Sequence, residues 1–177
     1  MSVREAHAAA LEQFRYSMNL IGPGQASMHF QDCDRALHGL KPSGRWVDLG
    51  CGAGFPGLVF ADLYPQIELQ LVDSRRKRCW FVQHVLDAAR RPDVSVRCQR
   101  VESLESAHFD GVMSRAFAPP PAVFEHARRL LVPGGELILF LQDEADISGA
   151  AGFEKVHVHP YTVSGKARRS ERWTFHG

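Results

Sequence analysis

Hydrophobic residues recur along this chain at two alternating spacings. In some segments they lie three or four residues apart, which is typical of one face of an α-helix, and in others they form short runs of strand length. The predicted helices cover residues ~4–19, the stretch from Ser27 to Leu40, and the stretches that begin at Pro56, after Asp73 and at Pro119. The predicted strands are 46–49, 67–72, 93–98, 109–113 and 136–141, and a weaker alternation from Gly152 ends in a strand over 171–175.

Turn residues separate these segments. Gly22-Pro23-Gly24 stops the first helix, Ser27 is placed to cap the second, and Pro133-Gly134-Gly135 breaks the helix whose apolar stripe ends at Leu131. Strands that alternate with helices of about 10–15 residues predict an α/β fold, a doubly wound and mostly parallel sheet with a short N-terminal helical extension. In 177 residues we expect a single domain, with N-terminal helices in 1–41 and the sheet core in 42–177.

Composition narrows the class of protein. Hydrophobic residues make up 45% of the chain and charged residues 23%, as in an ordinary globular protein, so a disordered chain is excluded. No run approaches the roughly 18 consecutive apolar residues of a membrane helix, and charges stand where a signal peptide has its apolar core. We therefore expect a cytoplasmic monomer with no membrane partner.

The cysteines argue against a zinc site and against a disulfide framework. Cys33, Cys51, Cys79 and Cys98 are widely spaced and include no Cys-x-x-Cys pair. This spacing predicts neither a zinc site nor a disulfide framework. We expect each of them to be a small buried hydrophobe and the protein to hold no metal.

Charge is distributed unevenly, although the net charge is only +1. The run Arg75-Arg76-Lys77-Arg78 lies in the first turn of a predicted helix, where the helix dipole disfavours cations. Such a run is either a solvated surface or a contact for phosphate groups, and the pattern leaves both interpretations open. We expect Lys166, Arg168 and Arg169 to extend a surface of the same sign.

A glycine cluster marks the candidate site. The stretch VDLGCGAGFPG, Val47–Gly57, has glycine at four of its eleven positions, directly after a predicted strand. In doubly wound sheets ligands bind beyond the carboxyl ends of the strands, which is where this cluster lies. Gly52-x-Gly54-x-x-Gly57 matches a dinucleotide-binding loop, and Asp73 ends the next strand, where an acid accepts hydrogen bonds from ribose hydroxyls.

The cluster begins earlier than a dinucleotide loop requires. Asp48 stands two residues before Gly50, and glycines follow at 52 and 54, which is the loop pattern of class I S-adenosylmethionine-dependent methyltransferases. Asp48 either balances the positive amino-acid end of that cofactor or holds the loop through backbone N–H groups. Asp48 and the later Pro-Gly-Gly both argue against a nicotinamide-dependent dehydrogenase.

Longer motifs resemble one family. In order, the chain contains GAGFPG, LVDSRRKR, RVES, FDGVMSRAFA and LLVPGG. Between Val47 and about Leu141 these resemble the bacterial 16S rRNA guanine-N7 methyltransferases, also called the glucose-inhibited division protein B family. Weaker similarity extends to Asn19-Leu20 and His29-Phe30-x-Asp32 upstream, and to Glu171-Arg172 downstream.

The resemblance implies a Rossmann-like class I methyltransferase fold, S-adenosylmethionine as cofactor, and 16S rRNA or the small ribosomal subunit as partner. It implies that Gly50 and Phe55 line the cofactor, that Val101 and Glu102 hold its adenine, and that Arg115 lies between cofactor and substrate. We expect Arg115 and Phe117 to position the purine, and no residue to act as a catalytic base. The complete predicted cofactor site is Asp48, Gly50, Gly52, Gly54, Phe55, Asp73, Val101, Glu102 and Arg115.

Several residues leave alternatives open. Glu102 either contacts the adenine or caps the following helix, and His29 is either a surface histidine or part of the substrate wall. The chain also departs from the family where Gln142-Asp143 replaces a lysine-glycine pair and where Ile21 replaces a threonine. These departures leave two further functions open: methylation of another RNA or a small molecule, and a cofactor-binding paralogue without activity.

Overall fold

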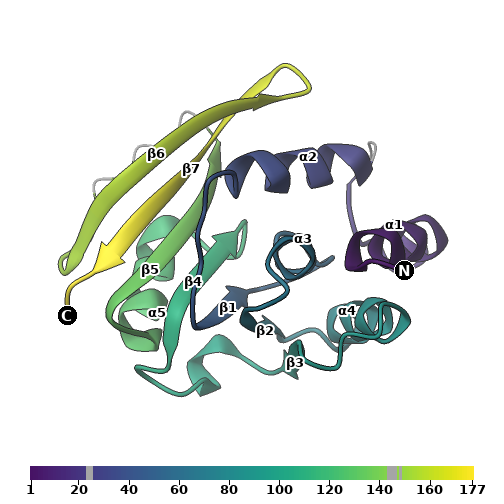
Figure 1. The fold of residues 1–177 in the computed structure, drawn as a ribbon, viewed down its shortest axis with the longest axis horizontal. Helices are drawn as coiled ribbons and strands as arrows, with labels where there is room; N and C mark the ends of the chain where they lie inside the picture. The colour runs from purple at the N-terminus through teal and green to yellow at the C-terminus, as the bar shows by residue number, and fades with distance from the viewer. Residues whose placement is uncertain (23–25, 143–146, 148) are drawn as a thin grey trace.

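The structure is a computed structural model that describes residues 1–22, 26–142, 147 and 149–177. Figure 1 shows a twisted sheet with helices packed on both of its faces. In chain order the elements are α1 (Val3–Phe14), α2 (Ala26–Ala36), β1 (Arg45–Leu49), α3 (Gly57–Leu63), β2 (Glu68–Asp73), α4 (Arg76–Ala88), β3 (Ser95–Cys98), the 3-10 helix η1 (Val101–Ser103), β4 (Phe109–Arg115), α5 (Pro120–Leu130), β5 (Leu131–Gln142), β6 (Phe153–Val163) and β7 (Lys166–Phe175).

The described strands form one seven-stranded sheet in the order β3-β2-β1-β4-β5-β7-β6. Strands β1 to β5 pair in parallel, whereas β7 runs antiparallel to both β5 and β6. Strand order reverses between β1 and β4, so their carboxyl ends form the crevice in which doubly wound folds bind ligands. The predicted α/β fold class is confirmed. In the described part of the chain, no helix is both long enough and apolar enough to span a bilayer.

Two apolar layers cover the sheet, one on each face. One layer packs residues of α1, α2, α3 and α4 against the sheet, and the other is built on α5 with Trp173 and Phe175 of β7. Strand β1 supplies both layers, because Trp46 points into the first and Val47 and Leu49 point into the second. This alternation follows from the two-residue period of a strand.

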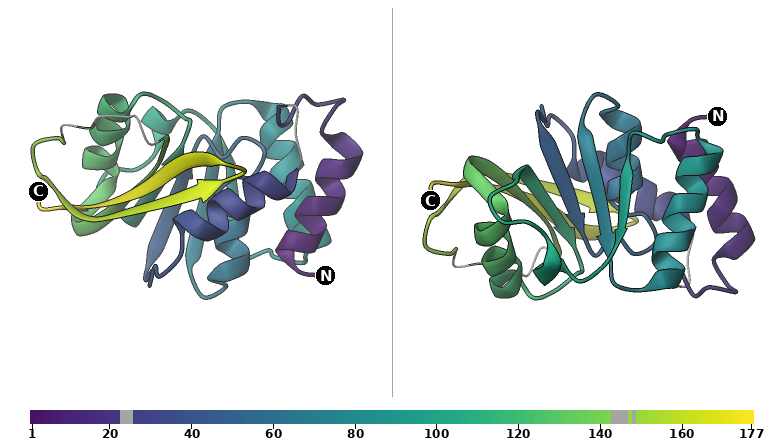
Figure 2. Two further views of the ribbon diagram at one scale, coloured as in Figure 1. Left: turned by 90° about the horizontal axis from the view of Figure 1, so that it is seen from above. Right: turned by 90° about the horizontal axis from the view of Figure 1, so that it is seen from below.

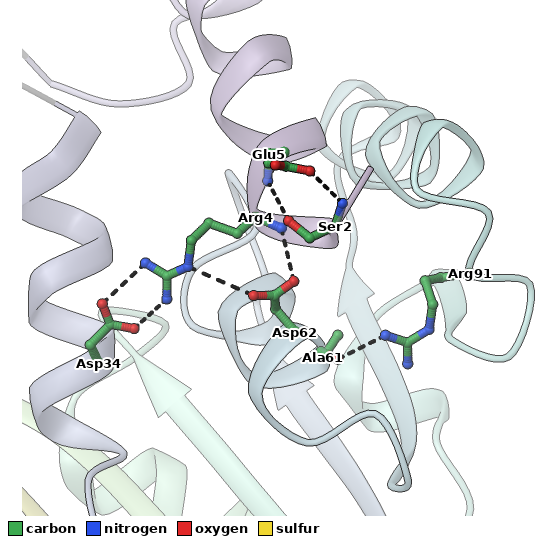
Figure 3. Close-up of polar contacts among 7 residues, drawn as sticks. All are labelled: Ser2, Arg4, Glu5, Asp34, Ala61, Asp62 and Arg91. Carbon is green, nitrogen blue, oxygen red and sulfur yellow. Dashed lines mark hydrogen bonds and ion pairs between the residues drawn. The ribbon is translucent and has the colours of Figure 1, made fainter.

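Helix α1 is shorter than the predicted segment ~4–19. Ser2 caps it, with a reciprocal hydrogen bond between Ser2 and the Glu5 side chain, and the residues from Arg15 to Asn19 form turns. Figure 3 shows how Arg4 then ties α1 to α2 through an ion pair with Asp34, and to α3 through its backbone N–H, which donates to Asp62 at 3.1 Å. The N-terminal helices are therefore fastened to the helix that follows the glycine loop.

Other predicted helix ends are also wrong, among them the end at Leu40, since α2 ends at Ala36. Ser27 lies inside α2 rather than before it, because the helix already includes Ala26, and Pro23 and Gly24 lie outside the described residues. Leu131 belongs to β5, where it pairs with Phe109, and the ladder resumes between Glu136 and Gly111. The Pro-Gly-Gly segment is thus an irregularity within a strand rather than the break between a helix and a strand.

One prediction about the cysteines also fails. Cys33, Cys51 and Cys79 are buried, but Cys98 at the end of the outer strand β3 is exposed. An edge strand has no neighbour on its far side to cover it. No group of three or more His, Cys, Asp or Glu side chains that could hold a metal occurs among the described residues.

Candidate functional site

The glycine loop connects the carboxyl end of β1 to the start of α3. Gly50, Gly52 and Gly54 have φ values of 69°, 54° and 88°, a region that side chains other than glycine rarely occupy. A Cβ atom at Gly50 would also lie 2.5 Å from the ring of Phe117. Glycine at position 50 is therefore required both by the turn and by the approach of an aromatic side chain.

Asp48, in β1, holds the far end of this loop through a hydrogen bond. Its Oδ2 accepts a hydrogen bond of 2.9 Å from the N–H of Gly57, where an added Cβ would lie only 2.5 Å from the same oxygen. Burial raises the pKa of the carboxyl group to about 7. Of the two roles that the sequence left open for Asp48, the described contact corresponds to holding the loop. Its other oxygen is buried and has no hydrogen-bond partner among the described residues.

Asp73 fixes the loop from the neighbouring strand. Its Oδ2 accepts from the N–H of Gly52 at 3.0 Å, and its Oδ1 accepts from the N–H of Arg75 at 2.9 Å. The Arg75 guanidinium also donates to both oxygens at 3.1 Å. Hydrogen bonds from Arg75 lower the pKa of this carboxyl group despite its burial, so it is charged at neutral pH.

Two cavities adjoin at Gly50. The larger, of about 740 Å³, is lined on the loop side by Gly50, Gly52 and Phe55 and on the strand side by Arg115. The smaller, of about 420 Å³, is lined by residues from the ends of β2, β3 and β4. Those that the sequence predicted are Gly50, Asp73, Val101, Glu102 and Phe117. Gly50, Arg75 and Ala116 line both cavities, so the two spaces meet across the loop.

Two of the predicted residues lie outside the cavity walls. Asp48 lies beneath the loop, and an added Cβ at Gly54 would point at Leu58 and His7 in the core. Glu102 lies in η1, and α5, the helix of the next crossover, begins after Pro119 with no side-chain cap, so the alternative of a capping glutamate is wrong. Glu102 instead lines the smaller cavity from its exposed position.

Arg115 is the centre of a polar network in the larger cavity. Its Nη2 lies 2.9 Å from Oδ2 of Asp32 and 3.0 Å from Nδ1 of His29, and its guanidinium lies over the Phe55 ring at 5.8 Å. The other oxygen of Asp32 accepts from the hydroxyl of Tyr161 at 2.9 Å. Three separate segments therefore fix the direction of the Arg115 side chain.

His29 is half-buried in the wall of this cavity rather than a plain surface histidine, and its contact with substrate stays a prediction. Burial and the nearby Arg115 lower the pKa of His29, so its ring is neutral at pH 7. Because a guanidinium only donates, Nδ1 accepts from Arg115 and the ring proton sits on Nε2.

Asp32 and Tyr161 were missed as site residues. Asp32 had a signal, because it falls in the His-x-x-Asp element, but Tyr161 had none. It comes from the weakly alternating C-terminal segment, and only the antiparallel return of β6 and β7 brings it to α2.

The basic run 75–78 is divided by the structure. Arg75 pairs with Asp73, and Arg78 donates to the carbonyl oxygens of Asn19 and Leu20 at 2.7 and 2.9 Å. Arg76 and Lys77 are exposed. Contact of this run with RNA stays a prediction, and Arg76 and Lys77 are the residues placed to make it.

The strand order, the glycine loop and the acid at the end of β2 define a fold of the class I S-adenosylmethionine-dependent methyltransferase type. A protein of Listeria monocytogenes assigned to that class matches all of this chain and 69% of its own length, with a TM-score of 0.66 and 13% identity. A mutant of MtNAS in complex with S-adenosylmethionine matches with a TM-score of 0.69 and 16% identity, over 99% of this chain and 72% of its own. The chain belongs to the GidB family, rRNA small subunit methyltransferase G, whose model matches residues 4–166.

Individual relatives support the family. The ribosomal RNA small subunit methyltransferase G of Novosphingobium aromaticivorans is 41% identical over 108 residues, which are 59% of this chain and 47% of the relative. That of Paracoccus denitrificans is 31% identical over 134 residues, 73% of this chain and 69% of the relative. The matched part spans about half the length of the Novosphingobium protein and 58% of that from Erythrobacter litoralis.

Proposed function

We propose that this chain is an S-adenosylmethionine-dependent methyltransferase that methylates guanine N7 in 16S rRNA of the small ribosomal subunit. The observation that carries the proposal is the pair of cavities that meet at Gly50, one bordered by carboxylates and the other by Arg115. Membership of the rRNA small subunit methyltransferase G family supports the same activity. We treat the chain as one domain, with N-terminal helices in 1–41 and the core in 42–177.

The smaller cavity fits the adenosine part of the cofactor. Asp73 offers carboxylate oxygens to ribose hydroxyls, Glu102 offers an acceptor to the adenine amino group, and Val101 and Phe117 offer apolar surface to the base. The loop glycines 50, 52 and 54, with Phe55 and Asp48, would hold the remainder beside Arg115. When bound, this cofactor supplies a methyl group on a positively charged sulfur.

The chain's own residues then act by positioning. Guanine N7 carries a free lone pair at neutral pH, so no residue has to remove a proton from it. Arg115 is held by Asp32 and His29 and can donate to an acceptor on the purine. The Phe117 ring, which the sequence also predicted to position the purine, lines the smaller cavity, so we assign it to the adenine of the cofactor. Alignment of this kind accounts for a large share of the rate in reactions between two bound partners. His29 has its Nδ1 occupied by Arg115, so it orients that side chain rather than serving as a base.

A different acceptor is the second candidate, and one observation favours testing it. Gln142 lines the larger cavity at the end of β5, where the family pattern has a lysine nearby. A neutral amide in place of a lysine removes a positive charge from that wall of the cavity, which changes how the wall can bind a phosphate or a base. The same cofactor chemistry on another RNA is therefore the alternative.

Mass spectrometry of rRNA nucleosides tests the proposal directly. Small subunits from a strain that lacks the gene are incubated with the purified chain and S-adenosylmethionine. We expect 7-methylguanosine to appear in 16S rRNA with wild-type protein and to form much more slowly with Arg115→Ala. Methylation of a different atom or a different RNA would favour the second candidate. No methylation of any RNA, despite cofactor binding, would favour a paralogue without activity.

A further inference from the structure

A row of rings runs along one face of β6. His157, His159 and Tyr161 occupy alternate positions, so they point to the same side of the strand. Their ring centroids lie 6.2 and 5.8 Å apart, and their planes differ by only 11° and 26°. His38, just beyond α2, adds a fourth ring that stacks on His159 at 6.1 Å.

Cationic side chains accompany the rings. In the pairing of β6 with β7, Arg172 lies opposite His157 and Arg168 lies opposite Tyr161. Residues directly opposite each other in a sheet share a face, so both guanidinium groups stand beside the row. Glu171, the acid between them in sequence, points to the other face, where it pairs with Lys155 and Arg169. The three rings therefore stand between two cations, while the acids of this face lie at the two ends of the row, Glu154 beyond His157 and Asp32 beside Tyr161.

The row is continuous with the larger cavity. Tyr161 and Arg168 both line that cavity, and the Tyr161 hydroxyl is bonded to Asp32 next to Arg115. Exposure increases outward, because Tyr161 and His159 are partly buried whereas His157 and His38 are exposed. Figure 2 shows the β6–β7 hairpin lying beside α2, and the hydroxyl of Ser170 fixes it there by donating to the carbonyl of Ala36 at 2.9 Å.

Packing accounts for Tyr161, which lies against the core layer of α1 to α4, but not for the outer rings of the row. An aromatic residue that serves the core is buried by its neighbours, as Trp173 on β7 is. The outer rings of the row face solvent instead, and so do Val156 and Val158 of the same strand. Aromatic and β-branched residues both favour strands, so strand propensity alone does not distinguish these rings; their alternate spacing between two arginines is the feature that indicates a ligand.

We propose that His157, His159 and Tyr161, with Arg168 and Arg172, form a docking surface for single-stranded RNA beside the target nucleotide. This inference rests on the proposed function and names the surface by which the same site holds its substrate. Bases that are not paired stack on aromatic side chains, and their phosphates pair with arginine. Bases within a duplex are stacked on their neighbours and cannot stack on these rings. The surface therefore selects an unpaired RNA segment, which enters the cavity at Tyr161.

The test compares three double variants and one single variant. His157→Ala with His159→Ala removes the rings, and His157→Phe with His159→Phe keeps flat rings while removing their nitrogens. Val156→Ala with Val158→Ala is the matched control in the same strand. Arg172→Gln removes one cation. Fluorescence anisotropy measures binding of a labelled single-stranded RNA of about ten nucleotides, with a duplex of equal length as comparison. Thermal unfolding and calorimetry with S-adenosylmethionine check fold and cofactor site.

We expect the alanine pair to weaken binding of single-stranded RNA by roughly tenfold or more. The phenylalanine and valine-to-alanine pairs should stay within about twofold of wild type, and Arg172→Gln should reduce the salt dependence by about one counterion. Cofactor affinity should be the same in all four. Wild-type RNA binding by the alanine pair, an equal loss in the phenylalanine pair, or equal binding of duplex RNA would each overturn the proposal. If the alanine pair does not fold, an unchanged salt dependence in Arg172→Gln overturns it.

A second measurement, the rate of methyl transfer to small subunits, tests the proposed function separately from this inference. Failure of the wild-type protein to methylate rejects the proposed function, whereas the RNA-binding comparison tests the surface independently. Normal RNA binding by the alanine pair together with a loss of activity on subunits would assign the surface to a ribosomal protein, and so would reject RNA as its ligand.

Discussion

The ring of His7 in α1 makes a buried hydrogen bond of 2.7 Å, through Nε2, with the carbonyl oxygen of Ala53 in the middle of the glycine loop. The same ring packs against Phe55 at 4.5 Å and against Phe30 at 5.1 Å. The first helix of the chain therefore supports the loop from the side opposite the cavities. Complete burial lowers the pKa of His7 to about 3, so the ring is neutral and donates from Nε2 at physiological pH.

His7 should make the protein sensitive to acid. Its pKa in the folded state lies below the ordinary value of 6.5, so its contribution to stability is full above about pH 6.5 and is lost as the pH falls toward 3. His7→Gln keeps a donor for Ala53 and does not titrate. We expect the advantage of wild type over His7→Gln in urea unfolding to shrink by about 2 kcal/mol between pH 7 and pH 5. His84→Gln is the control for the change of residue type, and an advantage that does not vary with pH would contradict the prediction.

Asp48 should have the opposite dependence. Its folded pKa of about 7 is raised above the ordinary 3.8, so stability falls as the pH rises from about 4 to 7, and the cost of the buried charge persists above that range. Asp48→Asn keeps an acceptor for the Gly57 N–H without the charge. We expect this variant to be more stable than wild type by about 1–3 kcal/mol at pH 8, with a smaller difference at pH 5. Guanidinium unfolding of both proteins at pH 5 and pH 8 measures this difference in stability. A less stable variant at pH 8 would show that the carboxylate is needed for folding.

Glu102 should contribute to cofactor affinity but not to stability. Its exposed side chain lines the smaller cavity, and losing one hydrogen bond to a charged group costs about 1.5–3 kcal/mol, or roughly 10- to 150-fold in affinity. We expect Glu102→Ala to weaken S-adenosylmethionine binding toward the lower end of that range in calorimetry. Glu105→Ala, another exposed acid in the same connection, is the matched control. Equal affinities in the two variants would remove Glu102 from the proposed adenine site.

Arg75 should oppose cofactor binding. Its guanidinium occupies both oxygens of Asp73, which the proposed ribose contact requires, while the N–H groups of Gly52 and residue 75 hold the carboxylate without it. Exposed ion pairs contribute about 0.2–1 kcal/mol. We therefore expect Arg75→Ala to tighten S-adenosylmethionine binding by a few fold, and Arg76→Ala, at an exposed neighbour, to leave it unchanged. Weaker binding in Arg75→Ala would mean that the guanidinium itself contacts the cofactor.

Asp32 should act on turnover rather than on cofactor affinity. It pairs with Arg115 at 2.9 Å from a buried position, so Asp32→Asn leaves the guanidinium without its anionic partner but keeps an acceptor for Tyr161. We expect the rate of methyl transfer to small subunits to fall about tenfold at saturating cofactor. Asp34→Asn, two residues along α2 and paired with Arg4, is the control. A rate equal to wild type in Asp32→Asn would show that Arg115 needs no positioning by Asp32.

The sequence predicted those parts of the fold and site that depend on residues close together in the chain. The positive φ angles of the loop call for glycine, and a strand followed by a helix leaves a regular pattern, so the loop, Asp73 and the order of elements could be predicted. The wall opposite the loop depends on pairing between distant strands. Neither the position of Tyr161 beside Asp32 nor the hydrogen bond from His7 to Ala53 leaves a local pattern, and a histidine within a helix reads as solvated until its surroundings are known.

The hydrogen bond between Tyr161 and Asp32 joins residues 129 positions apart. During synthesis, the loop, Asp73 and Arg115 leave the ribosome before β6 does, and at about 5–20 residues per second the delay amounts to several seconds. Throughout that time Asp32 has no tyrosine to fix it, and the surface along β6 does not exist. The wall of the larger cavity that Tyr161 and Asp32 complete is thus assembled last, after the glycine loop and the centre of the sheet have been synthesised.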